Sequence, residues 1–292
     1  MYEATLQYVK DRIEKLPTQY SWSFSEDALP CNIRLPAGGW FEKNLALKTA
    51  LNVAWQAGSR GERIELCNWY IAVWGGIRRN SEEKMRFYAT GSEESILTRG
   101  VQGIASWSKA LTVRAPSRFA IFDARTSLSL TAIQLLANTP NPMVFPSLPS
   151  QNNQVKAANA LVTTLRKTHR FQLVTSSGCY LEYNRLLSDI ARAVGQGLTN
   201  QMVEMVLFAD AELLGEELLR HRRPILAGSR NGRSHRGRCI HNCSSDRKRR
   251  DIRQPGTPIH QSPDHHEQRL LKYHSLRTTR NRKNLSLCGT CR

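Results

Sequence analysis

The chain has 292 residues, a net charge of +18 and a hydrophobic fraction of 40%, a composition that suits a soluble protein with a sizeable core. No apolar run approaches the roughly 18 residues that a membrane span needs. Residues 1–10 also lack the basic and then apolar pattern of a signal peptide. The sequence therefore predicts a cytoplasmic protein without a membrane segment.

The positive charge is concentrated at the C-terminal end. Residues 221–292 carry 18 Lys and Arg against 4 Asp and Glu, or +14, whereas residues 1–220 carry 24 against 20, or +4. The last 72 residues contain no Val, Phe, Met or Trp. Such a segment cannot bury enough apolar surface to offset the entropy of ordering it. We therefore expect a folded domain over residues 1–220 and a disordered basic tail over residues 221–292.

Two interpretations of this tail stay open. It is either an electrostatic arm that binds nucleic acid by releasing counterions, or a non-native terminus such as an out-of-frame read-through. The absence of any periodicity favours the second interpretation.

Four of the seven cysteines form two closely spaced pairs, which are candidate metal ligands. Cys239-x3-Cys243 and Cys288-x2-Cys291 have zinc-like spacings, but the 44 residues between the pairs exceed the spacer of a compact zinc module. We expect no metal and no cofactor. The remaining cysteines are predicted to be small core residues: Cys31, Cys67 and Cys179.

Apolar residues recur at helical spacing along most of residues 1–220, and no long alternating strand pattern is present. The first helix is expected to stop at Pro17. The Pro-rich residues 138–153 are expected to form a loop between two helical subsets. The sequence thus predicts an all-α domain. The predicted helices cover residues 2–16, 44–57, 63–74, 81–89, 93–99, 104–113, 124–137, 154–167, 180–194 and 200–220.

The most informative segment covers residues 93–136, where Gly100-x-x-Gly103 joins two predicted helices. Glycines let a nucleic-acid backbone approach closely, and the amides at a helix start form a phosphate site that reads no bases. We take Gly100, Gly103 and Ser108 as candidate contacts to a DNA backbone. A Gly-x-x-Gly turn also commonly does no more than join two helices, so both interpretations stay open.

Asp123 follows three apolar residues and begins the next predicted helix. Its carboxylate is expected to cap that helix by accepting from the amides of Arg125 or Thr126. A chemical role is the alternative, because a partly desolvated carboxylate can stabilise positive charge or activate a nucleophile.

Lys109 precedes Asp123 by 14 residues. It is either a solvated surface lysine that contacts at most a phosphate, or an amine nucleophile that forms a Schiff base. The second role requires burial or cationic neighbours to lower its pKa from about 10.4.

A hairpin followed by an apolar segment, an aspartate and a helix resembles the helix-hairpin-helix DNA glycosylases, the superfamily of endonuclease III and 8-oxoguanine glycosylase. Among them, the small bacterial 8-oxoguanine-glycosylase-like proteins are the most similar. The segments that carry the resemblance are WGGIRRN at 74–80, SK at 108–109, IFDAR at 121–125 and EMVLFA at 204–209.

The resemblance implies a two-lobed all-α fold that binds double-stranded DNA across a cleft and excises a damaged base, such as an oxidised purine. It implies that Asp123 is the catalytic aspartate, which stabilises the oxocarbenium-like sugar as the N-glycosidic bond breaks. The target base would be flipped out of the duplex. Trp74, Trp107 and Asn80 are candidates for the base pocket, although core packing is the expected use of both tryptophans.

The hairpin departs from the family pattern Leu-Pro-Gly-Val-Gly-x-Lys, in which lysine follows the second glycine by two residues. Ala105 holds that position here, and Lys109 lies one turn later on the same helix face. Three alternatives stay open: Lys109 supplies lyase chemistry from a shifted hairpin, water is the nucleophile, or the protein is a non-catalytic DNA-binding module, for instance in a defence system. The lesion and any protein partner are undetermined by the sequence.

Overall fold

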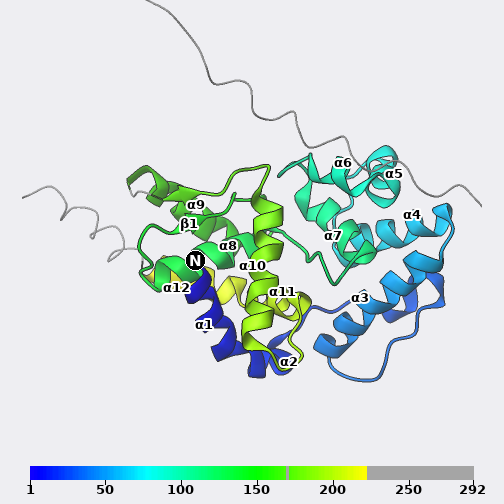
Figure 1. Cartoon of the computed structure of the whole chain (residues 1–292), viewed down its shortest axis with the longest axis horizontal. Coiled ribbons are helices and arrows are strands. Elements are labelled where there is room, and N and C mark those ends of the chain that lie inside the picture. Colours follow the sequence, from blue (N-terminus) through cyan, green and yellow to red (C-terminus); the bar gives the residue numbers. More distant parts are fainter. Residues whose placement is uncertain (169–170, 222–292) are drawn as a thin grey trace, which may run out of the picture. The chain divides into compact units, whose positions relative to one another are not determined.

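The computed structural model describes residues 1–168 and 171–221, which lie within one compact unit, Met1–Arg236. The tail predicted to be disordered, apart from His221, and its cysteine pairs lie outside these described residues. The described chain is almost entirely helical, which confirms the predicted all-α class (Figure 1). Its α-helices are α1 (Tyr2–Arg12), α2 (Leu16–Gln19), α3 (Trp40–Ala57), α4 (Arg60–Asn68), α5 (Glu82–Thr90), α6 (Glu93–Leu97), α7 (Ile104–Arg114), α8 (Ala124–Leu136), α9 (Asn153–Thr168), α10 (Cys179–Val194), α11 (Asn200–Ala209) and α12 (Ala211–Arg220).

Short elements complete the described part of the chain. Single 3-10 turns are η1 (Ile13–Lys15), η2 (Glu26–Ala28) and η3 (Pro30–Asn32), and η4 (Trp69–Trp74) is a π-helical turn. The strands β1 (Met143–Val144) and β2 (Gln172–Leu173) pair in parallel. Since β1 lies within residues 138–153, that predicted loop includes a short piece of sheet.

Serine side chains fix where several helices begin. Ser59 and Glu62 form a reciprocal capping box at the start of α4. The hydroxyls of Ser81 and Ser92 accept the amides of residues three positions later, at the starts of α5 and α6. Each cap satisfies an amide that has no partner within its helix, so these local sequences set the helix boundaries.

Four sequence predictions need correction. Pro17 does not end a helix but lies in the first turn of α2, where its missing N–H costs nothing. The predicted helix 63–74 changes from α-helical to π-helical at Trp69. The predicted helix 200–220 breaks at Asp210, whose carboxylate accepts from the Tyr8 hydroxyl at 2.8 Å. Cys31 is exposed rather than buried, with a left-handed backbone at φ +53°.

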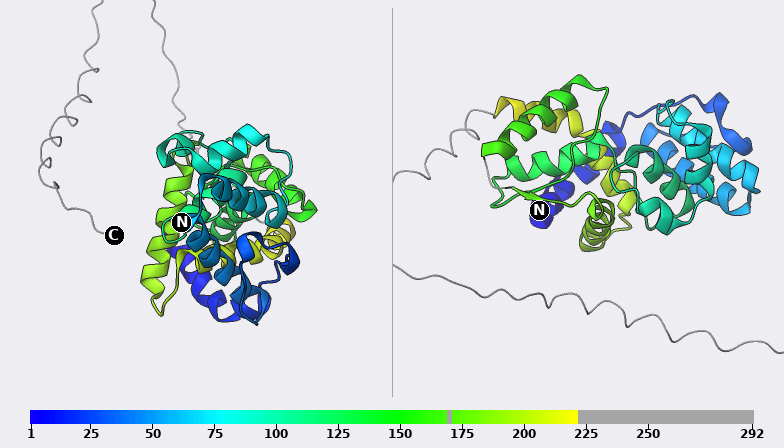
Figure 2. Two further views of the ribbon diagram at one scale, coloured as in Figure 1. Left: turned by 90° about the vertical axis from the view of Figure 1, so that its right-hand side faces the viewer. Right: turned by 90° about the horizontal axis from the view of Figure 1, so that it is seen from above.

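The helices pack as two groups that lie side by side in Figures 1 and 2. In the first group α3, α4, η4, α5 and α7 contact one another, and in the second α8 contacts α1, α9, α11 and α12. The helix α2 contacts both α3 and α11. The first group comes from the early part of the chain, but α1 belongs to the second, so the grouping does not follow the sequence order.

Candidate functional site

The predicted glycine turn lies between α6 and α7. Gly100 and Gly103 have φ angles of +55° and +72°, in the left-handed region that favours glycine. The carbonyl of Gly103 accepts the amides of Ser106 and Trp107, at 2.9 and 3.1 Å, and so begins α7. A β-carbon on Gly100 would stand 3.0 Å from the carbonyl oxygen of Ser176. Both glycines are therefore needed for backbone reasons, and the contact with a DNA backbone stays a prediction.

Ser108 lies inside the domain. Its side chain is fully buried, and its hydroxyl accepts the Phe122 amide at 3.1 Å and donates to the Phe122 carbonyl at 3.3 Å. The structure therefore uses Ser108 to tie α7 to the segment before Asp123, and its hydroxyl does not face the surface.

The segment 119–122 is buried, yet it belongs to no helix and no strand. Side chains of α10 satisfy its backbone instead. The amide of Ala120 donates to Asn184 Oδ1 at 2.7 Å, and the carbonyl of Ala120 accepts from the Tyr180 hydroxyl at 3.0 Å. The Tyr183 hydroxyl donates to the carbonyl of Ile121 at 2.7 Å. These bonds, together with that of Ser108, fix where the chain delivers Asp123.

Asp123 caps α8, as one of its two interpretations predicted. Its Oδ1 accepts the amides of Arg125 at 2.9 Å and Thr126 at 3.2 Å, and the Thr126 hydroxyl accepts the Asp123 amide at 3.0 Å. The side chain is partly exposed. The structure shows no hydrogen bond to Oδ2 from the described residues, so a cap at Oδ1 leaves the second oxygen free for another partner.

Lys109 is not a solvated surface lysine, since only 3% of it is exposed. Its Nζ donates to the Ala105 carbonyl at 2.9 Å and lies 6.0 Å from the centre of the Trp74 ring. A β-carbon on Gly75 would stand 2.6 Å from its Cε, so this glycine makes room for the lysine. The Nζ therefore reaches back one helical turn to the backbone of Ala105.

Burial makes the Lys109 ammonium group easier to deprotonate than that of an exposed lysine. Burial lowers the pKa of Lys109, opposed by the negative charges of Asp123 and Glu204 and assisted by the positive charge of Lys48. An ammonium group has three donors to satisfy, whereas the structure shows one acceptor among the described residues, the Ala105 carbonyl. Asp123 and Lys109 are thus within electrostatic range of each other.

A buried ion pair near Lys109 escaped the sequence analysis. Lys48 Nζ on α3 lies 2.6 Å from Glu204 Oε2 on α11, and their side chains are only 3% and 2% exposed. Burial raises the pKa of Glu204, an effect that Lys48 opposes. The two residues are 156 positions apart, so no local spacing joins them. One feature of the sequence pointed to a buried charge at this position: Glu204 is the single charged residue among the apolar residues of 203–208.

The predicted base-pocket residues are engaged within the protein. Trp74 and Trp107 are 5% and 0% exposed, as core packing predicts. The indole N–H of Trp74 donates to Asn44 Oδ1 at 2.9 Å. Asn80 donates through Nδ2 to the Ser106 hydroxyl at 2.9 Å, so it fastens the loop after η4 to the start of α7. Of the three, Trp74 directly borders Lys109.

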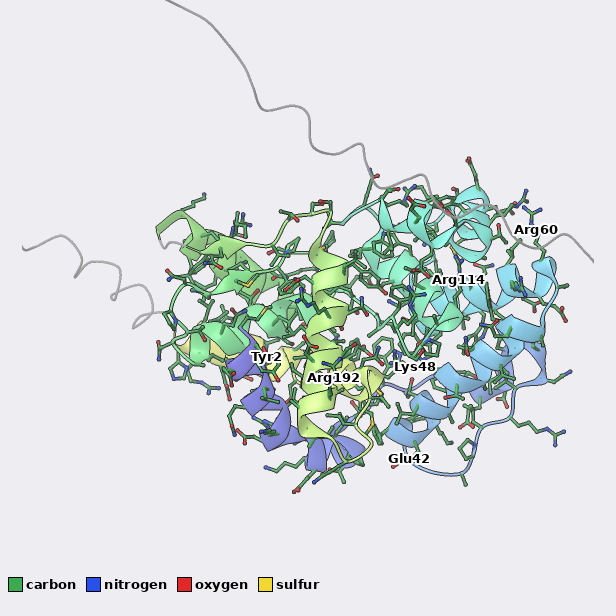
Figure 3. The ribbon with its side chains drawn as sticks, in the orientation of Figure 1. Tyr2, Glu42, Lys48, Arg60, Arg114 and Arg192 are labelled. Carbon is green, nitrogen blue, oxygen red and sulfur yellow. The ribbon has the colours of Figure 1, made fainter. Side chains whose placement is uncertain are left out.

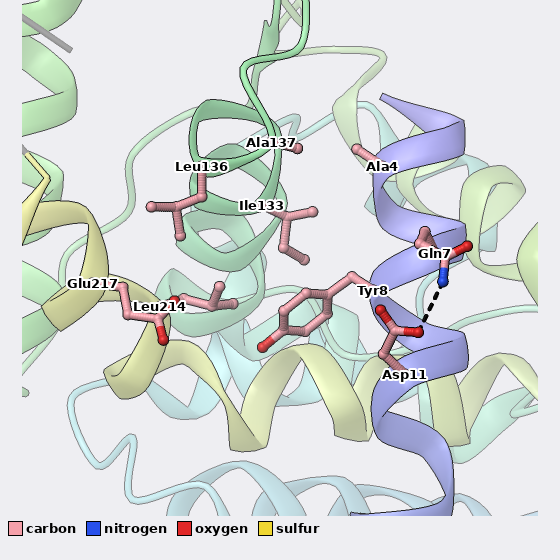
Figure 4. A pocket seen from close by; sticks show the side chains of 9 residues that line it. All are labelled: Ala4, Gln7, Tyr8, Asp11, Ile133, Leu136, Ala137, Leu214 and Glu217. Carbon is pink, nitrogen blue, oxygen red and sulfur yellow. Dashed lines mark hydrogen bonds between the residues drawn. The ribbon is translucent and has the colours of Figure 1, made fainter. Parts of the chain in front are cut away.

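Two surface hollows lie away from these residues. One, of about 300 Å³, is formed by side chains of α1, α8 and α12, including Tyr8, Ile133 and Leu214 (Figure 4). The other, of about 380 Å³, is lined by Tyr2 and by residues near the end of α10. Neither hollow is lined by Asp123 or Lys109.

Comparison with protein-family models, with curated proteins and with solved structures gave no match for this chain. Within the described residues, no helix combines the length and apolar character that crossing a membrane would require.

Proposed function

We propose that the protein is a DNA-binding base-excision glycosylase that acts through Lys109 and Asp123. The observation that carries the proposal is a buried lysine amine with one hydrogen-bond acceptor, within electrostatic range of a carboxylate that keeps one oxygen free. An amine that loses its proton more readily than an exposed lysine, beside a fixed negative charge, suits nucleophilic attack on a centre that becomes cationic. The glycine turn at the start of α7 supports phosphate binding next to this pair.

In the proposed reaction, the neutral Lys109 amine attacks C1′ of the damaged nucleoside. The bond between Lys109 Nζ and C1′ forms as the N-glycosidic bond between the base and C1′ breaks. The electron pair of the broken bond leaves on the base, which takes up a proton. The Asp123 carboxylate stabilises the positive charge on the sugar. The attached amine then loses a proton. Its lone pair forms the C1′=N bond as the C1′–O4′ bond breaks, O4′ takes up a proton, and the product is a protonated Schiff base. Water attacking C1′ in place of the amine would give simple hydrolysis.

The test uses the full chain and duplex oligonucleotides that each contain one oxidised purine. Wild-type protein is expected to release the base and to form a covalent complex with DNA under borohydride, which Lys109→Ala abolishes. Lys84→Ala, an exposed lysine on α5, is the matched control and is expected to retain trapping. Asp123→Asn is expected to lower base release at least 100-fold with unchanged folding, because asparagine caps a helix as well as aspartate does.

A non-catalytic DNA-binding module is the second candidate. The absence of Asp123 and Lys109 from both described hollows favours it. A module would bind duplex DNA with strong salt dependence and release no base from any lesion. In that case Asp123→Asn would leave every DNA measurement unchanged, and the enzymatic proposal would be abandoned.

A further inference from the structure

The Lys48–Glu204 ion pair joins the two groups of helices. Lys48, labelled in Figure 3, projects from α3 in the first group, and Glu204 belongs to α11 in the second. Removing two charges from water costs several kcal/mol per ion in proteins. A buried pair is therefore weak grounds for inferring added stability. Both of its charges also act on Lys109.

A chain of contacts connects this pair to Lys109. Asn44 lies one turn before Lys48 on α3, and its side-chain oxygen accepts the indole N–H of Trp74 at 2.9 Å. The Trp74 ring centre is 6.0 Å from Lys109 Nζ. Asn44 is itself anchored through Nδ2 to the carbonyls of Trp22 and Trp40, at 2.9 and 2.7 Å. The helix that carries Lys48 is therefore linked to Lys109 through Asn44 and Trp74.

Three charged groups within the described residues act on Lys109, and each comes from a different element. Asp123 at the start of α8 and Glu204 on α11 favour its ammonium form, whereas Lys48 on α3 disfavours it. The Asp123 carboxylate already accepts two amides through Oδ1. Glu204 is the acid whose effect depends on another side chain, because Lys48 contacts it directly at 2.6 Å.

We propose that Lys48 is a positioning residue, which holds the Glu204 carboxylate in an ion pair and so makes the Lys109 ammonium group easier to deprotonate. Without Lys48, Glu204 would be a buried carboxylate whose negative charge acts on Lys109 without the opposing charge of Lys48. That charge favours the ammonium form of Lys109, and an ammonium group is not a nucleophile. The inference rests on the proposed function for its purpose, but it concerns the charge of Lys109 in the free protein.

The proposal predicts effects of opposite sign for the two partners. Lys48→Gln keeps a donor for Glu204 but removes the positive charge, so Lys109 is expected to hold its proton to higher pH. Glu204→Gln removes a negative charge and leaves the Lys48 ammonium unpaired, so Lys109 is expected to lose its proton at lower pH. A purely structural role for the pair predicts loss of stability in both variants and no such opposition.

The experiment is a pH titration of the full chain labelled with [13Cε]lysine, followed by NMR without DNA. The signal of Lys109 is assigned by its absence from Lys109→Met. Lys48→Gln is expected to raise the Lys109 midpoint and Glu204→Gln to lower it, each by about tenfold in the protonation equilibrium. Lys48→Arg, which preserves the charge, is the matched control and is expected to match the wild-type titration.

Shifts in the same direction for the two variants, or no shift in either, overturn the proposal. If Lys48→Gln does not fold, Glu204→Gln decides alone, and a midpoint that stays or rises overturns it. Opposite shifts support it even if no lesion yields a released base, a result that would reject the proposed function only. If base release is also observed, Lys48→Gln is expected to move its pH profile to higher pH, which a structural role would not do.

Discussion

Replacing Ser108 by alanine tests whether this hydroxyl holds the segment that delivers Asp123. The change removes both hydrogen bonds to Phe122, at 3.1 and 3.3 Å, and leaves a buried amide and a buried carbonyl without this partner. A lost hydrogen bond of this kind costs about 1–2 kcal/mol when its backbone group stays buried. We therefore expect the free energy of unfolding to fall by about 2–4 kcal/mol.

The assay is urea unfolding at 25 °C, followed by tryptophan fluorescence. Ser127→Ala is the matched control: Ser127 is also buried, and its hydroxyl donates one bond across the structure, to the Pro146 carbonyl at 2.7 Å. It is expected to lose about half as much stability. If Ser108→Ala costs no more than Ser127→Ala, the structural reasoning is wrong. If it weakens DNA binding at unchanged stability, Ser108 is a DNA contact.

Three other predictions concern the turn, the lysine and the domain boundary. Gly103→Ala is expected to cost about 1–2 kcal/mol of unfolding free energy, because φ is +72° and the new Cβ would lie 2.7 Å from the Tyr88 hydroxyl oxygen; Gly61→Ala on α4, with open space around it, should cause no loss in the same urea titration. Since burial lowers the pKa of Lys109 below 10.5, the unfolded chain binds that proton more tightly. Wild-type stability should therefore rise relative to Lys109→Met as the pH increases towards 10.5, and equal slopes at pH 7–10 would contradict the burial argument. A chain truncated after Arg220, where α12 ends, should keep the circular dichroism and cooperative unfolding of a folded domain, and an unfolded product would place the boundary elsewhere.

Local features of the fold were predictable from the sequence. Helix periodicity, the serine before α5 and the glycines of the hairpin act over three or four residues, and the structure contains the corresponding helices, cap and left-handed turn. The cap at Asp123 is local in the same sense. The π-helical turn at Trp69 and the break at Asp210 were not predicted. The Asp210 carboxylate accepts a hydrogen bond from Tyr8, which is 202 positions away, and a contact of that kind leaves no local pattern in the sequence.

The candidate site was only half accessible to sequence reasoning. The sequence singled out Asp123 and Lys109 as candidate site residues. Whether Lys109 is solvated or buried depends on how α3 and η4 pack against α7. The Lys48–Glu204 pair depends on two helices that are far apart in the chain. Long-range pairing of polar groups leaves no periodic pattern, so only the three-dimensional arrangement reveals it.

The segment 119–122, which leads to Asp123, is held in place by side chains and not by a neighbouring strand. Its backbone is held by side chains from three helices: Ser108 on α7, Tyr180, Tyr183 and Asn184 on α10, and Gln201 on α11, which donates to the Phe119 carbonyl at 2.7 Å. A neighbouring strand would have bonded to it along one edge. Here side chains of α7, α10 and α11 form hydrogen bonds to different backbone groups of the segment. A displacement of any one of these helices would therefore break or strain a hydrogen bond to the backbone that leads to the Asp123 carboxylate.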